Sequence, residues 1–261
     1  MKLFLLFFLP FVFSLFGAPL KLAIVGVPEF VDLTIAELSD DDGLELIERS
    51  AISQVLKEHS FSEMRLSGSE LCKLFPHADV FAVIAEKSMR TFNAKNGFCL
   101  SDSEHGGAAK KMVGDIRLAM AKTAQDEPLL LSKLAYRDAG VARRLQKRLP
   151  EVVADIERML LADQNIQLLE RDRLEMVATE RGLSGATFQL PASTLLIAFE
   201  FEPGENGGMV NLLIQVHDLT QRKVAEESIK DLFNHPNHIR RGVDALRKKL
   251  LQGARQKGNY H

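Results

Sequence analysis

LIERSAISQVLKE at residues 46–58 and LLERDRLEMVATE at residues 168–180 share one pattern of apolar and charged positions. Each stretch has two aliphatic residues followed by Glu and Arg, and further apolar residues and a final Glu at matching places. The second stretch follows the first at a constant offset of 122 residues (168 − 46 and 180 − 58). Internal repetition of this kind predicts a chain built from two copies of one structural unit.

Met1 is followed by Lys2, an apolar run over residues 3–16, and the small residues Gly17 and Ala18. This order is typical of a secretory signal peptide, so we expect residues 1–18 to be removed and the protein to be exported, periplasmic or secreted. An uncleaved anchor is the alternative, but a spanning helix needs about 20 apolar residues, and Pro10 lies within the run. We expect no membrane span in the mature chain.

Composition limits the classes of partner. The mature chain of about 240 residues is longer than a typical single domain. The formal net charge of the full chain is −2, which argues against nucleic-acid binding, and the chain has no Trp and two Tyr for stacking on bases or sugars.

From the length and the repeated pattern, we predict a first repeat over residues 19–125, a second over residues 128–252, and a disordered tail over residues 253–261.

Apolar periodicity predicts the same order of elements in both units. The expected elements of the first unit are a strand at 20–27, a helix carrying Val31, Ile35 and Leu38, a strand at 44–47, helices beginning near Ser50 and Ser69, a strand at 80–85 with a hairpin partner around 98–100, and a helix carrying Val113, Ile116 and Met120. Those of the second unit are a strand at 129–134, a helix carrying Val152, Ile156 and Met159, a strand at 166–169, a helix after Asp172, a hairpin of 195–199 with 210–216, a helical region from Ala225 to Phe233, and a helix carrying Val243, Leu246 and Leu250. The predicted fold class is α/β (α+β), as two small tandem domains, each a mixed β-sheet flanked by helices.

The repeated pattern resembles the periplasmic α/β domain shared by the curli secretion channel family and the flagellar outer-membrane assembly lipoproteins. Residues 44–49 with 52–58, and 166–171 with 174–180, carry the resemblance. In the first unit, LCKLF at residues 71–75 followed by ADVFAV at 78–83 is also similar. The resemblance implies the fold, an envelope location and a tendency towards protein assembly. The lipidated N-terminal cysteine of the curli channel has no counterpart here.

The Glu-Arg pairs of the repeat, Glu48-Arg49 and Glu170-Arg171, follow a strand and precede a helix. Such side chains satisfy backbone groups at a strand-to-helix corner through charge-assisted hydrogen bonds, which is the structural interpretation. The functional alternative is that one residue of each pair faces a partner groove or a small ligand.

The two cysteines, Cys72 and Cys99, both fall in the first unit. In an exported protein they could form one disulfide, and the alternative is two buried thiols that behave as small apolar residues.

No catalytic, cofactor-binding or metal-binding motif stands out. His235 and His238 have the spacing of a metal pair, but a structural zinc site needs four ligands, and Pro236 lies between them. The Gly-rich loop at residues 204–208 lacks the Gly-Lys-Ser/Thr ending of a phosphate loop. We therefore expect no cofactor and no enzymatic activity.

One charge cluster distinguishes the second unit: Arg143, Arg144, Lys147 and Arg148, interleaved with Leu145 and Leu149. It is either a solvated helix face or a contact with an anionic partner. The expected function is that of an exported, non-enzymatic envelope protein, an assembly or accessory factor that contacts envelope proteins and could self-associate. The alternatives are a peptidoglycan- or small-ligand-binding module, or an enzyme with a site between the domains.

Overall fold

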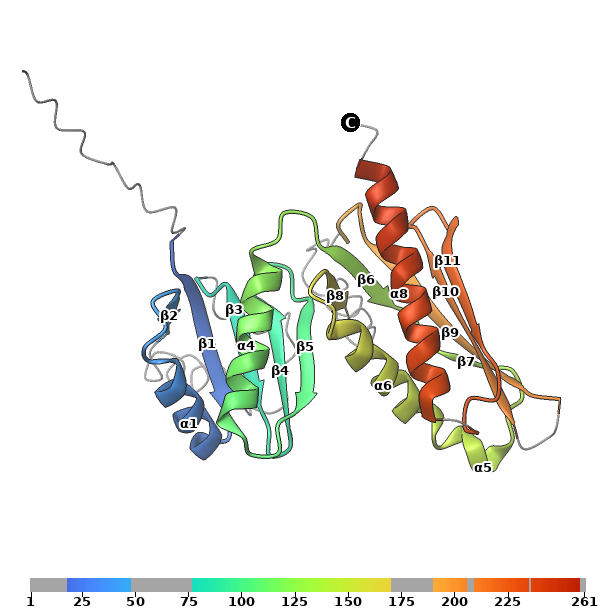
Figure 1. The fold of residues 1–261 in the computed structure, drawn as a ribbon, viewed down its shortest axis with the longest axis horizontal. Helices are drawn as coiled ribbons and strands as arrows, with labels where there is room; N and C mark the ends of the chain where they lie inside the picture. The colour runs from blue at the N-terminus through green and yellow to red at the C-terminus, as the bar shows by residue number, and fades with distance from the viewer. Residues whose placement is uncertain (1–17, 48–76, 170–189, 206–208, 235, 259–261) are drawn as a thin grey trace, which may run out of the picture.

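The computed structural model describes residues 18–47, 77–169, 190–205, 209–234 and 236–258. Within these ranges, eleven strands form one mixed sheet, and helices cover it (Figure 1). This arrangement confirms the α/β class predicted from the sequence.

The first half of the sheet has the strand order β2-β1-β3-β4-β5. Strand β1 is parallel to both β2 and β3, whereas β3, β4 and β5 are antiparallel neighbours. Helix α1 follows β1, and helix α4 follows β5. The bounds are β1 Leu20–Gly26, α1 Pro28–Leu38, β2 Leu44–Leu46, β3 Val80–Ile84, β4 Ser88–Asn93, β5 Cys99–Glu104 and α4 Ala109–Thr123.

The second half has the equivalent order β8-β6-β9-β10-β11, with the same sequence of parallel and antiparallel pairs. A short extra strand, β7, pairs with β9. It belongs to the connection between β6 and α6, which also contains the basic run. The bounds are β6 Leu129–Lys133, β7 Arg137–Asp138, α5 Arg143–Gln146, α6 Leu149–Leu161, β8 Ile166–Leu169, β9 Leu195–Pro203, β10 Val210–His217, β11 Lys223–Ile229 and α8 Pro236–Gly258.

The two halves meet where β5 pairs with β8. In the first half, the pairing of β1 with β2 begins at Leu20 with Leu44. In the second half, the pairing of β6 with β8 begins at Leu129 with Ile166. Strands β2 and β8 thus keep the 122-residue offset of the sequence pattern (166 − 44). The halves nevertheless share one sheet, through the antiparallel pair of Cys99 with Leu168. A division into two separate domains is therefore not confirmed.

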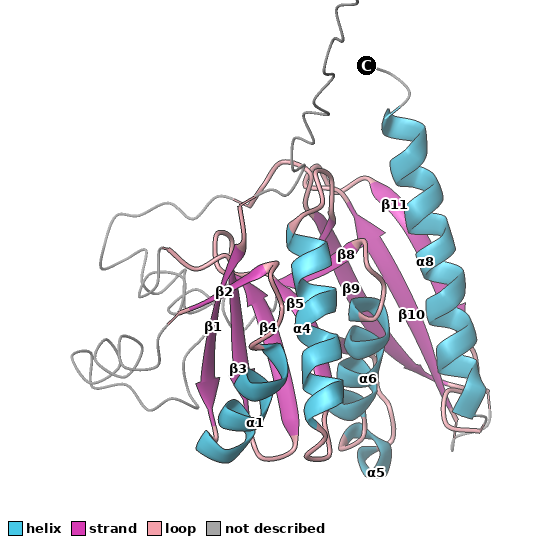
Figure 2. Cartoon of the chain, turned by 60° about the vertical axis from the view of Figure 1, so that its left-hand side comes forward, coloured by secondary structure: helices cyan, strands magenta, loops and turns pink. Residues whose placement is uncertain are grey.

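Helices α1, α4, α6 and α8 lie side by side on one face of this sheet (Figure 2). Alternation along the strands determines which side chains they cover. In β9, Leu195, Ile197, Phe199 and Phe201 are buried, while the residues between them are partly buried. These side chains join the buried faces of α6 and α8 in one apolar core.

Gly26, at the end of β1, has a specific steric role. Its φ is +131°, a value that L side chains rarely adopt. A Cβ at this position would lie 1.9 Å from the carbonyl oxygen of Ile84 on β3. That oxygen accepts a hydrogen bond from the Val27 N–H at 2.9 Å, so the glycine permits the tight passage from β1 into α1.

Two predicted elements were wrong. The hairpin partner of β3 is β4, and β5, which begins at Cys99, pairs with β4 rather than with β3. The segment from Ala225 to Ile229 is strand and not helix, because it pairs with β10 through a turn in which Asp218 Oδ1 accepts from the Thr220 and Arg222 N–H groups.

At the C-terminal end, helix α8 continues to Gly258, into the segment predicted as a disordered tail. The predicted helices near Ser50, Ser69 and Asp172 lie outside the described residues.

Candidate functional site

The basic run forms an exposed surface on the connection between β7 and α6. Val141 and Leu149 are 3% and 1% exposed, and Leu145 packs against the core, so apolar residues anchor the segment. Arg143, Arg144 and Lys147 point to solvent from and just after the short helix α5. We call these three residues, with Arg148, the α5 basic surface.

Arg148 has a different environment from the other three. Its guanidinium carbon lies 4.1 Å from the centre of the Phe233 ring, within the range of a cation–π interaction. Phe233 itself packs against the core just before α8 begins. Arg148 thus attaches the α5 segment to the start of α8, and Figure 1 places α5 at the end of the molecule where α8 begins.

The remaining positive charges of this surface are not neutralised within the described part of the chain. No ion pair of Arg143, Arg144 or Lys147 occurs there, whereas Lys133 and Glu157 nearby form a close pair of 2.7 Å. In α8, exposed Arg240 and Arg241 add two more cations in the first turns of the helix. The arrangement can attract an anionic partner at a distance and form charge-assisted hydrogen bonds on contact.

The repeat signature falls at the edge of the described chain. Strand β8 ends immediately before the Glu-Arg pair, and β2 ends at Leu46, one residue short of it. The residues Glu48, Arg49, Glu170 and Arg171 themselves lie outside the described residues, so both interpretations of these pairs stay predictions.

Of the two cysteines, Cys99 opens strand β5 and is buried, with its thiol donating to the Ser101 carbonyl at 3.3 Å. Cys72 lies outside the described residues, and the disulfide between them stays a prediction.

The most unusual charged group is one that the sequence analysis did not single out, Lys122 of α4. This residue is fully buried, and its Nζ donates to the carbonyl oxygens of Leu100 at 2.5 Å, Leu161 at 2.5 Å and Ile166 at 2.8 Å. It lies three and six residues beyond Ala119 and Ile116 on the buried stripe of the helix. That spacing is the sequence signal that could have revealed it.

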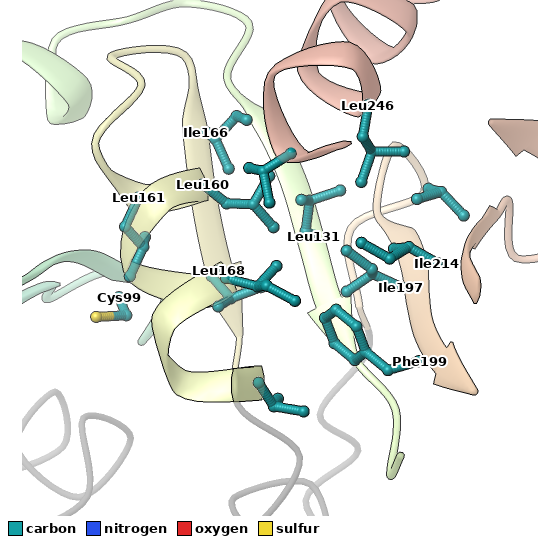
Figure 3. Close-up of a cluster of buried hydrophobic side chains, with 14 of the residues drawn as sticks. Cys99, Leu131, Leu160, Leu161, Ile166, Leu168, Ile197, Phe199, Ile214 and Leu246 are labelled. Carbon is teal, nitrogen blue, oxygen red and sulfur yellow. The ribbon is translucent and has the colours of Figure 1, made fainter. Parts of the chain in front are cut away.

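Burial lowers the pKa of Lys122 from its ordinary 10.5 to about 8, because the charged form loses its hydration. Negative charge at Cys99 and on the carboxylate of Asp163 opposes this effect and favours the charged form. Leu161, Leu168 and Cys99 belong to the apolar cluster at this junction (Figure 3). Since the ammonium is enclosed by carbonyls and apolar side chains, its role is structural.

His105 also has a structural environment. It is 2% exposed, its Nε2 lies 2.8 Å from the Ala85 carbonyl, and its Nδ1 accepts from the Gly107 N–H at 2.9 Å. Both ring nitrogens are thus occupied by backbone groups, which assigns the proton to Nε2. His238 Nδ1 lies 3.1 Å from the Lys230 carbonyl, and His235 is outside the described residues.

Within the described ranges, no group of three His, Cys, Asp or Glu side chains is arranged to hold a metal ion. In the same ranges, every helix is too short or too polar to cross a bilayer.

Comparison with known proteins adds no relative. No protein-family model matches the chain, and no curated protein or solved structure is similar enough to count as a match.

Proposed function

We propose that this protein is an exported, non-enzymatic envelope protein that acts through protein–protein contacts, with the α5 basic surface as its main contact. The observation that carries the proposal is the set of three exposed cations, Arg143, Arg144 and Lys147, without an ion-pair partner in the described chain, on a segment anchored by buried Val141 and Leu149. An anchored segment presents its charges with little ordering cost on binding.

The direction of the apolar side chains favours a protein partner over a lipid surface. A helix that binds a membrane presents a wide apolar face to the acyl chains. In α5 the apolar side chain, Leu145, packs inward against the core. The exposed side chains of α5 are two arginines and a glutamine, followed by Lys147, and this cationic surface suits the acidic surface of another protein.

The envelope location rests on residues 1–18, which have the pattern of a secretory signal peptide, and on the resemblance of the repeat to periplasmic assembly domains. Both are sequence expectations, and they identify the compartment in which the partner is to be sought.

The experiment is an affinity capture from envelope extract with the mature protein, residues 19–261, and a triple variant Arg143→Glu/Arg144→Glu/Lys147→Glu. A matched control reverses three other exposed lysines, Lys87, Lys110 and Lys248, for which no ion pair occurs in the described chain. We expect a defined protein to be retained by the unaltered chain and the control and to be lost with the triple variant. We also expect retention to fall as salt rises, because exposed charges are screened.

Equal retention by both variants would overturn the assignment of this surface. If nothing is retained and light scattering shows a monomer, the assembly function itself is wrong.

A further inference from the structure

The sheet has a weak point in its middle. Strands β9 and β10 pair without interruption from Pro203–Val210 to Leu196–His217. By contrast, within the described residues β5 and β8 pair through a single residue pair, Cys99 with Leu168. The two half-sheets are therefore joined by far less backbone hydrogen bonding than either contains.

Three carbonyl groups near this junction are not used by regular secondary structure. Leu161 is the last residue of α6, where carbonyls have no partner within the helix. Leu100 is the bulged residue of β5, since Cys99 pairs with Phe92 and Ser101 with Thr91.

The third carbonyl belongs to Ile166 in β8. The Leu129 N–H of β6 donates to the Asn165 carbonyl, one residue earlier. Because successive carbonyls of a strand point to opposite sides, the Ile166 carbonyl points away from β6 and towards β5.

Lys122 binds all three of these carbonyls. It belongs to α4 of the first half, and two of its acceptors, Leu161 and Ile166, belong to the second half. A return bond runs from Gln167 Nε2 to the Lys122 carbonyl at 3.2 Å. The ammonium of Lys122 thus donates the hydrogen bonds at the junction, where the backbone N–H groups of a longer β5–β8 pairing would otherwise donate them.

We propose that Lys122 is a latch between the two half-sheets, and that its release lets the sheet open between β5 and β8 while each half-sheet keeps its own pairing. Each half has its own strands and its own helices, α1 with α4 and α6 with α8, although Phe92 and Cys99 of the first half share the larger apolar cluster with α6. Across the junction, the other described polar contacts include the exposed pair of Arg158 with Glu104 at 3.5 Å, which contributes little.

Charged groups around the latch come from two further elements. Asp163 follows α6 and pairs with Arg247 of α8 at 3.1 Å, so its carboxylate is already shared. From β5, negative charge at Cys99 acts on Lys122 and raises its pKa, against the effect of burial. The ammonium is therefore stabilised mainly by the carbonyl dipoles. When its hydrogen bonds to these carbonyls are lost, its burial loses this stabilisation. The proposal does not depend on what the α5 basic surface binds.

Hydrogen exchange on the full mature chain tests the latch. The variant Lys122→Met keeps an unbranched apolar stem and removes the donors, and Lys110→Met, on the exposed face of the same helix, is the matched control. In Lys122→Met we expect peptides covering β8 to lose protection by about tenfold or more, because even one hydrogen bond to a charged donor is worth that factor. Peptides covering β3 and β10 should keep theirs.

An equal loss of protection in β3, β8 and β10 would show Lys122 to be an ordinary core residue and overturn the proposal, as would an unchanged β8. A second measurement uses the unaltered chain and does not depend on the variant folding. In rising sub-denaturing urea, β8 amides should exchange through an opening that exposes less surface than global unfolding. If they exchange only with β3 and β10 in one global step, no latch exists.

Discussion

Lys122 makes the stability of the protein depend on pH in a direction that can be worked out in advance. In the folded protein its pKa is about 8, below the ordinary lysine value of 10.5. Between these values the folded chain has released the proton while the unfolded chain still holds it. The free energy of unfolding therefore rises with pH across this window, and the full penalty of burying the ammonium is present below about pH 8.

The magnitude follows from the same two values. The difference between 10.5 and about 8, at about 1.4 kcal/mol for each pKa unit, gives about 3 kcal/mol. Lys122→Met has no proton to release here. The stability of the unaltered protein minus that of the variant should therefore increase by about 3 kcal/mol as the pH is raised from about 7 to beyond about 10.5.

The assay is urea unfolding followed by circular dichroism at several pH values, under reducing conditions. Groups common to both proteins cancel in the difference. Because negative charge at Cys99 acts on the pKa of Lys122, the series is repeated with Cys99→Ala in both proteins. Lys110→Met, which alters an exposed lysine of the same helix, should show no pH-dependent difference. A difference that stays constant across the window for Lys122→Met would refute the argument that burial controls this pKa.

Two further predictions concern buried groups. Thr194 is fully buried, and its hydroxyl has no hydrogen-bond partner among the described residues. Thr194→Val should therefore raise the free energy of unfolding in urea by about 1 kcal/mol. Thr91→Val, which removes the 2.7 Å bond to Ser101, should lower it, and equal effects of the two substitutions would contradict the reasoning. Gly26→Ala should lower the free energy of unfolding by about 3 kcal/mol or more, because the added Cβ meets the Ile84 carbonyl and φ is +131°. A melting temperature within about 2 °C of that of the unaltered protein would contradict this, and would show that β1 and β3 can separate there at little cost.

Local patterns identified much of the fold. Alternation or continuous apolar runs marked β1, β2, β6, β8 and the β9–β10 hairpin, and apolar stripes marked α1, α4, α6 and α8. These predictions succeeded because each element buries one face, and burial leaves a periodic trace in the sequence.

The missed strands have a common cause. In β4, the residues between Ser88 and Asn93 include Arg90 and Thr91, and Thr91 is buried because its hydroxyl bonds Ser101 across the strands. In β11, Glu226 and Glu227 favour helix locally, but the turn at Asp218 and pairing with β10 decide for strand. Tertiary contacts outweighed local preference in both segments.

The sequence alone predicted the cationic run of the candidate site, because the charged residues and their spacing follow directly from the order of the residues. The structure was needed to show that Arg148 is occupied by Phe233 while Arg143, Arg144 and Lys147 are exposed.

Most of the strands and helices were thus predicted from the sequence by itself, because their apolar patterns depend on neighbours a few residues apart. Only the tertiary structure decided that the two half-sheets join and that a lysine closes the junction. The acceptors of Lys122 lie 22, 39 and 44 residues away along the chain. These acceptors are backbone carbonyls at a helix end, at a strand bulge and on the outer side of a strand. Such carbonyls produce no periodic pattern in the sequence, because their hydrogen-bond donor comes close only when the chain folds.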